Sequence, residues 1–453
     1  MVTITKPKTQ LNLPPGPKGH PVFGVLPDYR DGALDFATRC AKEYGDIVLW
    51  QGPLFRAFQL NHPDYIEEVL VSRSNLFGKH RSLNIFKRLL GNGLVSSDGE
   101  FWQRQRRMIQ PAFHQERIVG YGKVMVDYAL TMLNSWQDGQ ERDIHDEMMG
   151  LTLEIVAKTL FEADVKQQVE IVGKALETSI EYYEVRNTNL LVYLLPDWFP
   201  TRKNLAYIGA MQQMDEMLYT IINQRRVSNQ DKGDLLSMLL HIQDEDGARM
   251  TDKQLRDEVM TLMFAGHETT ALTLSWGLYL LSQHPEVEAK LLEEINAVLG
   301  EKAPTFADLP ALRYTEHVIM EIMRLYPAAW AIGRQALQDC EIGGYNLRAG
   351  DAVIVSQWVT QRDARYFQDP EAFEPERWFV DFAKKLPKFA YFPFGGGSRI
   401  CIGKSFAMME AVLLLATIIQ KYHLELAPLQ DITPWPAFTL RPKHGIKMKL
   451  CKR

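Results

Sequence analysis

Apolar residues recur every three to four positions along most of this chain, a spacing typical of amphipathic α-helices. A long helix is expected from Thr251, a residue type that caps helices, to about Gln283, because Pro285 prevents its continuation. The same spacing predicts further helices over residues 34–44, 63–71, 101–109, 120–136, 151–160, 169–182, 206–223, 235–241, 285–299, 315–326 and 403–422.

Runs typical of strands are fewer and cluster near the two ends of the chain. They predict strands over residues 47–51, 56–60, 340–347 and 352–355, and a late hairpin over residues 438–450. The expected fold class is therefore mainly α, a large helical domain with small peripheral β-sheets. Strands and helices do not alternate as in βαβ units, and no Gly-x-Gly-x-x-Gly opens a helix, which argues against nucleotide-dependent hydride transfer within this chain.

The prolines near the N-terminus predict an extended arm over residues 1–21, because proline fixes φ and removes backbone donors. Residues 22–453 are expected to form a single domain, with no attached reductase domain. No apolar run approaches the ~20 residues that span a bilayer, and none suits a signal peptide, so a soluble protein without a transmembrane anchor is expected.

The composition is that of an ordinary globular enzyme. Of 453 residues, 46% are hydrophobic and 24% charged, which excludes a disordered chain. The net charge of −5 argues against nucleic acid as the main partner. The four cysteines are far apart, which indicates a reducing compartment and a cytoplasmic location.

The most informative segment is residues 394–403, the cysteine loop. Its three consecutive glycines allow a tight turn, Cys401 lies just before a helix N-terminus that favours a thiolate, and Gly403 lets a flat, bulky group approach the backbone. Arg399 could meet an anion on that group. A buried free cysteine or a nucleophile is the alternative, but a nucleophile needs a general base and no local histidine serves. A single thiolate suits haem iron better than zinc.

The cysteine loop resembles the haem-binding loop of the cytochrome P-450 family, with Phe394, Gly397, Arg399, Cys401 and Gly403 at the positions of its pattern. The resemblance implies the cytochrome P-450 fold and haem b held through iron by Cys401. It extends over nearly the whole chain and is closest to soluble bacterial-type relatives that hydroxylate fatty acids or terpenoids.

Glu321 and Arg324 lie at i, i+3 in a predicted helix, which alone would indicate a solvated ion pair. The resemblance implies instead a buried charge network of Glu321, Arg324 and Arg377, with Trp378 where phenylalanine is commoner. This network would hold the cysteine loop in register and take no part in the chemistry.

Gly266, Glu268 and Thr269 fall in the middle of the long predicted helix, where glycine is unfavourable. A tolerated kink is one explanation. The resemblance implies an oxygen-activation segment in which Gly266 lets the helix bulge, Thr269 donates a hydrogen bond during dioxygen activation and Glu268 helps to bring protons from solvent.

Trp102 and Arg106 lie at i, i+4, which could simply reflect a basic amphipathic helix. The resemblance implies that they hold a haem propionate, together with Arg334. His80 is a further candidate, although neighbouring Lys79 or Arg81 could take its place. The walls of the substrate pocket are expected, by the same resemblance, from Leu83, Phe86, Phe264, Ala265, Ala328, Ala329, Ile332 and Phe438.

The resemblance implies a haem-thiolate monooxygenase that inserts one oxygen atom of dioxygen into a small lipophilic substrate, either a fatty acid or a terpenoid or carotenoid-like compound. Electrons would come from NAD(P)H through separate partners, a soluble ferredoxin or flavodoxin and its reductase. Two alternatives remain: a haem-thiolate enzyme that uses peroxide or isomerises a hydroperoxide, and a non-catalytic haem sensor.

Overall fold

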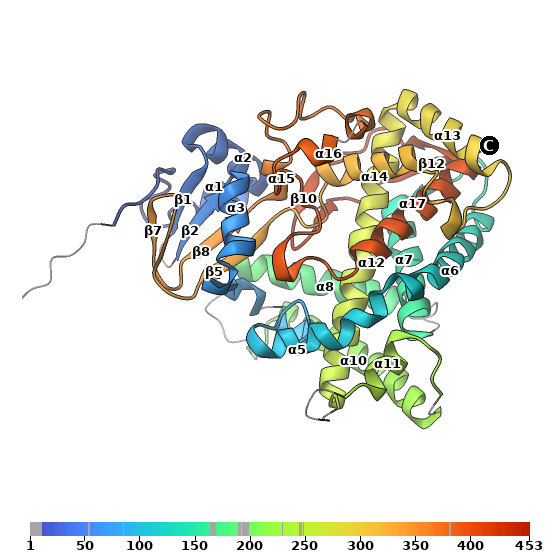
Figure 1. The fold of residues 1–453 in the computed structure, drawn as a ribbon, viewed down its shortest axis with the longest axis horizontal. Helices are drawn as coiled ribbons and strands as arrows, with labels where there is room; N and C mark the ends of the chain where they lie inside the picture. The colour runs from blue at the N-terminus through green and yellow to red at the C-terminus, as the bar shows by residue number, and fades with distance from the viewer. Residues whose placement is uncertain are drawn as a thin grey trace, which may run out of the picture.

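The computed structural model describes residues 11–52, 55–84, 86–163, 169–188, 192, 199–228, 230–243, 247, 249–379 and 382–453. Helices gather around the long helix α12 (Asp252–Gln283), and the largest sheet lies at one side of this helical body (Figure 1). In the part of the chain that is described, no helix is both long and apolar enough to cross a bilayer.

The predicted helices are present. The described helices are α1 Leu26–Asp31, α2 Ala33–Tyr44, α3 Pro63–Glu67, α4 Lys87–Leu90, α5 Gly99–Ile109, α6 Gln115–Asn134, α7 Ile144–Phe161, α8 Val169–Thr188, α10 Arg202–Ser228, α11 Leu235–His241, α12 Asp252–Gln283, α13 Pro285–Leu299, α14 Arg313–Leu325, α15 Gln357–Thr360, α16 Phe382–Lys385 and α17 Lys404–Lys421.

Helix α12 is the centre of the hydrophobic core. The Thr251 side chain accepts a hydrogen bond from the backbone N–H of Gln254, whose own side chain reaches back to the backbone N–H of Thr251. This capping box satisfies two donors that a helix N-terminus otherwise leaves unpaired. Pro285 begins the next helix and ends α12 where the sequence predicts. Helices α7, α10, α14 and α17 pack around α12 and bury most of its length.

The strands lie in separate sheets. They are β1 Ile47–Gly52, β2 Phe55–Leu60, β3 Phe77–Lys79, β4 Glu141–Asp143, β5 Ile332–Ala336, β6 Cys340–Ile342, β7 Tyr345–Leu347, β8 Ala352–Val355, β9 Tyr422–Leu426, β10 Pro434–Pro436, β11 Leu440–Pro442 and β12 Lys447–Lys452. Among the described residues, the largest sheet has the order β1-β2-β8-β5-β3, with β2 and β8 parallel and Ala57 opposite Ala352.

The predicted hairpin over residues 438–450 is wrong. Strand β11 pairs with β10, whereas β12 pairs with β9 and β4, so the two halves of the segment belong to different sheets. The ladder of β11 ends where Pro442 lies opposite Pro434, and neither residue has a backbone N–H to donate. Strand β11, which is not paired with β12, packs against α12.

The described part of the N-terminal arm is hydrogen-bonded to two sheets. The backbone N–H of Leu49 in β1 donates to Pro15 O over 2.9 Å, and Asn346 in β7 donates to Asn12 O over 2.8 Å. Residues 1–10 of the predicted arm lie outside the described residues.

Candidate active site

A cavity of about 340 Å³ lies between α12, α5, the cysteine loop and the chain that leads into β5. Its lining is mostly apolar. It brings together most of the residues that the sequence singled out, namely Trp102, Arg106, Ala265, Gly266, Thr269, Ala328, Ala329, Ile332, Arg334, Phe394, Arg399, Cys401 and Gly403.

The cysteine loop is held by its own backbone and by glycine. The N–H of Cys401 donates to Phe394 O over 3.0 Å. Gly397 has φ +67°, and a Cβ at this position would lie 2.0 Å from Leu70 O, so only glycine fits. A Cβ on Gly403, in contrast, would lie no nearer than 3.7 Å to any protein atom, in the ring of Phe113. The surrounding protein therefore leaves space for a side chain at position 403. The need for glycine there is explained if a flat group in the cavity lies against its backbone.

Cys401 lines the cavity, and its surface is exposed there. Burial raises its pKa, while the N–H of Gly403 and the charges of Arg106 and Lys404 act in the opposite direction. Within the described ranges, no three His, Cys, Asp or Glu side chains are grouped to hold a metal ion. A metal at this thiol would therefore need its remaining ligands from a cofactor, as haem iron does.

Four cations line the cavity and form a cation cluster: Lys79, Arg106, Arg334 and Arg399. Burial, the charge of Arg334 and that of Arg399 hold the pKa of Lys79 well below its usual range, and burial together with Arg399 lowers the pKa of Arg334 to about 10. Burial is the largest cause of both shifts, and repulsion between the cations adds to it.

Asp98 is the acid that faces the cation cluster. It forms an ion pair with Arg399, and its Oδ2 accepts from the backbone N–H of Lys79 over 2.8 Å. Among the described residues, Asp98 is the carboxylate that acts on Lys79, Arg334 and Arg399, which leaves room for further anions. The two propionates of haem b would supply them, and guanidinium groups bind carboxylates well. The residues present therefore fit haem b.

Other predicted residues lie outside the lining. His80 does not line the cavity; the adjacent Lys79 does, which is one of the two substitutes that the sequence suggested. Leu83 and the three predicted pocket phenylalanines are not in the lining either. Phe86, Phe264 and Phe438 form an aromatic cluster, in which the ring centre of Phe438 lies 4.2 Å from that of Phe86 and 5.8 Å from that of Phe264.

Gly266 serves close packing. Helix α12 is α-helical throughout, so the expected bulge at Gly266 is absent from this structure. A Cβ at Gly266 would lie 3.0 Å from Cγ2 of Val156 on α7, tighter than ordinary contacts, so glycine permits the approach of the two helices. Thr269 lines the cavity, and its hydroxyl donates to Ala265 O over 2.9 Å, one turn back.

Glu268 is fully buried and does not line the cavity. Its Oε1 accepts from Thr439 Oγ1 over 2.5 Å and from Arg441 Nε over 2.8 Å. Burial alone would raise the pKa of Glu268, but the charge and hydrogen bond of Arg441 hold it below its usual value. In this structure Glu268 is therefore an ionised partner of β11.

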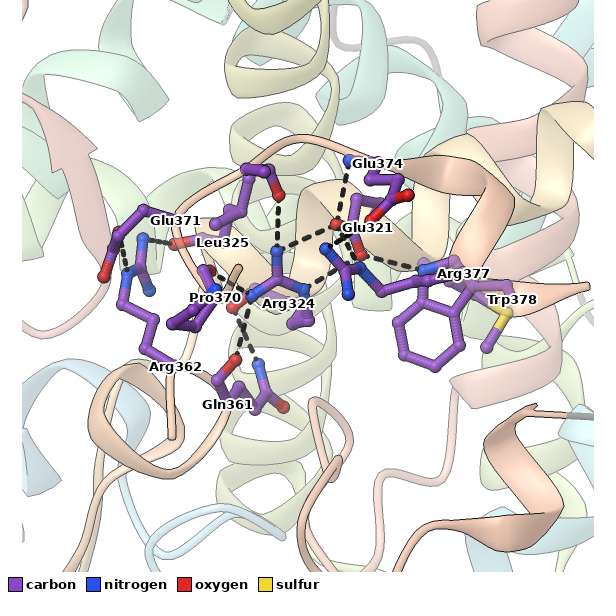
Figure 2. Close-up of polar contacts among 12 residues, drawn as sticks. Glu321, Arg324, Leu325, Gln361, Arg362, Pro370, Glu371, Glu374, Arg377 and Trp378 are labelled. Carbon is purple, nitrogen blue, oxygen red and sulfur yellow. Dashed lines mark hydrogen bonds and ion pairs between the residues drawn. The ribbon is translucent and has the colours of Figure 1, made fainter. Parts of the chain in front are cut away.

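The predicted charge network is assembled on α14 (Figure 2). Glu321 and Arg324 are completely buried, with Arg324 Nη2 2.8 Å from Glu321 Oε1 and Arg377 Nε 2.8 Å from the same oxygen. The indole N–H of Trp378 donates to Glu321 Oε2 over 2.9 Å. Arg324 also donates to the carbonyl oxygens of Gln361, Pro370 and Ala372. The network thereby ties α14 to the chain that precedes the cysteine loop.

Sequence reasoning missed Asp98, Thr439 and Arg441, and it named Trp378 without its hydrogen bond to Glu321. Thr439 and Arg441 lie far along the chain from Glu268, and no local pattern connects them. The role of Trp378 could have been suspected, since a tryptophan where phenylalanine is commoner adds one N–H donor.

Comparisons with known proteins show the family of this chain. The family model described as Cytochrome P-450 matches residues 14–450. The chain belongs to the cytochrome P-450 family. It is 37% identical to a cyclooctatin synthase of Streptomyces melanosporofaciens, over 88% of this chain and 87% of that protein. It is 36% identical to a cyclooctat-9-en-7-ol 5-monooxygenase of the same organism, over 85% and 84%.

A pentalenene oxygenase of Streptomyces avermitilis is 34% identical, over 90% of this chain and 91% of that protein. The crystal structure of a cytochrome P-450DA heme domain superposes with a TM-score of 0.88 at 28% identity and covers 98% of both chains. The predicted family and fold class are thus confirmed. This cytochrome P-450 is a haem-dependent monooxygenase.

Proposed function

We propose that this cytochrome P-450 hydroxylates a cyclic terpenoid. The names of the three bacterial relatives support this class of substrate, since one is a pentalenene oxygenase and another acts on cyclooctat-9-en-7-ol. The predominantly apolar lining of the cavity supports it too. Among the described residues, the cations of the lining all belong to the cation cluster, so none is left to bind the carboxylate of a fatty acid.

The observation that carries this proposal is the arrangement of one cavity. Cys401, the hydroxyl of Thr269 and the cation cluster all line this cavity. Bound haem would activate dioxygen with two electrons and two protons, so that one oxygen atom enters the substrate and the other leaves as water. The thiolate of Cys401 would hold the haem iron, and the cation cluster would bind the propionates. Trp102 stacks against Arg399, with 4.1 Å between the guanidinium carbon and the ring centre.

The remaining residues act on protons and on the substrate. We assign to Thr269 the role of donating a hydrogen bond at the reacting end of the cavity. We assign to Glu268 the role of supplying protons to Thr269. Ala328 and Ala329 are small, which leaves room for a bulky substrate. Phe394 and Gly403 would lie against the porphyrin from the side of the cysteine loop.

Substrate class is tested by optical titration of the haem-loaded protein. We expect the reduced protein under carbon monoxide to give the absorbance of a thiolate-ligated haem. We expect cyclooctat-9-en-7-ol and pentalenene to shift the Soret band, and fatty acids of equal carbon number to leave it unchanged. A Soret shift with fatty acids alone would contradict the terpenoid proposal.

We also propose that electrons from NAD(P)H arrive through a soluble ferredoxin or flavodoxin and its reductase, in the cytoplasm. Such donors are generally acidic, and Arg107 and Lys404 are exposed on α5 and at the start of α17. Arg104, on the same helix as Arg107, would contribute to this face.

Charge reversal tests this face. Arg107→Glu and Lys404→Glu should slow reduction by an acidic ferredoxin at least ~10-fold at low salt, and the difference should shrink as salt rises. Lys302→Glu is the matched control, because Lys302 lies far from the proposed docking face. The carbonyl of Lys302 accepts a hydrogen bond from Gln420 on α17. From Gln420 to Lys404, α17 is about 24 Å long, given the rise per residue of a helix. Equal reduction rates and equal salt dependence in all three variants would contradict this docking face.

A further inference from the structure

Residues 91–95, which we call the loop wall, lie in the chain between α4 and α5. Two of them, Leu94 and Val95, line the cavity. Thr261, in the third turn of α12, lines it too, and its hydroxyl donates to Leu90 O over 3.3 Å, just before the loop wall. The loop wall and α12 thus line one cavity, and the contacts between them fix where Leu94 and Val95 lie in it.

Two acids of α12 accept hydrogen bonds from the backbone of the loop wall. Asp257 Oδ2 accepts from the N–H of Asn92 over 2.8 Å, and Glu258 Oε2 accepts from the N–H of Leu94 over 2.9 Å. Asp257 is 3% exposed and Glu258 is 1% exposed, so little water competes for these N–H groups. Leu94 is therefore both a residue of the cavity lining and the residue that Glu258 holds.

Glycine at two positions allows the loop wall to approach α12 this closely. Gly91 has φ +58°, and a Cβ there would lie 1.9 Å from Asp257 Oδ1. A Cβ on Gly93 would lie 2.6 Å from the backbone carbonyl oxygen of Asp257, which cannot rotate away. A side chain at either position would therefore push the loop wall off the helix. The two glycines flank Asn92, so the hydrogen bond from Asn92 to Asp257 depends on both.

Cations balance the charge of Asp257. Arg256 Nη1 and Lys253 Nζ each lie 3.1 Å from one of its carboxylate oxygens. Arg256 Nη1 also donates to Leu89 O over 2.9 Å, two residues before the loop wall, and Asp215 on α10 pairs with the same arginine. This group of charges fixes Asp257 beside the loop wall.

We propose that Asp257 and Glu258 are positioning residues that hold the loop wall on α12, so that Leu94 and Val95 present a fixed apolar surface to the substrate. The proposal rests on the proposed function in one respect, namely that a substrate fills this cavity. It extends that function to specificity. A wall that is already ordered need not be ordered by the substrate, so bulky molecules that contact it gain affinity relative to small ones that do not.

The protonation of Glu258 makes this attachment depend on pH. Burial raises the pKa of Glu258 to about 8, while the N–H of Leu94 lowers it and the charge of Asp257 raises it. Within the described part of the chain, Asp257, with the cations named above beside it, is the charged group that acts on Glu258. If the loop wall left α12, water would reach Glu258 and its pKa would fall. The attached state therefore keeps a proton that the detached state releases, so the attachment weakens as the pH rises toward about 8.

Amide hydrogen exchange measures the attachment directly, in the haem-loaded protein and without any substrate. We expect the amides of Asn92 and Leu94 to be protected in the wild type. Asp257→Ala and Glu258→Leu should each accelerate exchange in the loop wall at least ~10-fold, which corresponds to the loss of one hydrogen bond to an acid.

Two control variants accompany this measurement. Glu258→Gln is neutral and its carbonyl oxygen still accepts from Leu94, so it should keep the protection. Asp252 is an exposed acid in the first turn of the same helix and pairs with Arg226, so Asp252→Asn should keep it too. The protection of the wild type relative to Glu258→Gln, compared at equal pH, should fall as the pH is raised from about 5 to about 8.

Azole ligands that bind haem iron measure the effect on specificity without a terpenoid. Imidazole is small enough to bind at the iron alone, whereas clotrimazole carries three aromatic rings that fill the space above it. In optical titrations, Asp257→Ala and Glu258→Leu should bind clotrimazole ~10-fold more weakly than the wild type and imidazole equally well. Gly93→Ala leaves both acids in place but pushes the loop wall off α12, so it should have the same effect and carries the test if the acid variants do not fold.

The outcomes separate the possible failures. If the loop wall exchanges at the same rate in all variants, the two acids do not hold it and the proposal is wrong. If exchange is faster but the ratio of clotrimazole to imidazole affinity stays at the wild-type value, the contacts stabilise the fold without setting specificity, which also contradicts the proposal. Terpenoids that fail to shift the Soret band would contradict the proposed function alone, because neither the exchange nor the azole titration uses a terpenoid.

Discussion

Cys401→Ala protein should lose the absorbance of a thiolate-ligated haem under carbon monoxide and should hydroxylate nothing. Cys401 is the cysteine that lines the cavity, and its thiolate would hold the iron. Loss of a group that merely supports a metal ligand costs ~10–100-fold in activity, so loss of the ligand itself should cost more than ~100-fold. Optical spectra and product formation measure the two effects.

Cys340→Ala is the matched control, because Cys340 is a free cysteine in β6 that does not line the cavity. It should keep both the spectrum and the activity. If Cys401→Ala kept its carbon monoxide spectrum, or if the Cys340 variant lost it, the assignment of the ligand would be wrong.

The second large effect is expected at Glu321. Its carboxylate pairs with Arg324 and Arg377 and accepts from the indole of Trp378, and Glu321 and Arg324 are completely buried. Glu321→Gln keeps the shape but removes the negative charge, which leaves a buried guanidinium uncompensated. Breaking a buried pair in this way typically costs ~3–5 kcal/mol. We expect a lower free energy of unfolding in denaturant titrations and a low haem content after purification.

Glu425→Gln provides the comparison, because the ion pair of Glu425 with Lys449 spans 3.6 Å and both side chains are about half exposed. Such a surface pair contributes ~1 kcal/mol at most. Equal stability losses in the two variants would mean that the buried network is not what holds the segment in front of the cysteine loop.

Much of the fold could be predicted because local signals mark its helices. The capping Thr251 and the following Pro285 define α12, and α11 and α13 begin and end where the sequence predicts. Strands were harder. Strand β5 was missed although it lies within the largest sheet, because a run of five residues that contains a glycine and an arginine shows no alternation. The predicted hairpin failed because β11 packs against α12, whereas β12 packs against α7 and pairs with β9 and β4.

The candidate site divides in the same way. The cysteine loop and the charge network could be found because their residues keep fixed spacings in the sequence. The pairing of Glu268 with Thr439 and Arg441 could not, because it joins α12 to a strand more than 170 residues later. Nor could the choice of Lys79 over His80, which depends on the direction in which β3 presents its last side chain.

The close approach of α12 and α7 at Gly266 limits how this enzyme can be redesigned. Any larger residue at that position must displace the Val156 side chain, which lies in the tight contact between the two core helices. Ala328 and Ala329 lie on a wall formed by a connecting segment, where added volume would narrow the binding space without moving a helix. Engineers who wish to change regioselectivity should therefore begin mutagenesis libraries at these alanines and leave the glycine untouched.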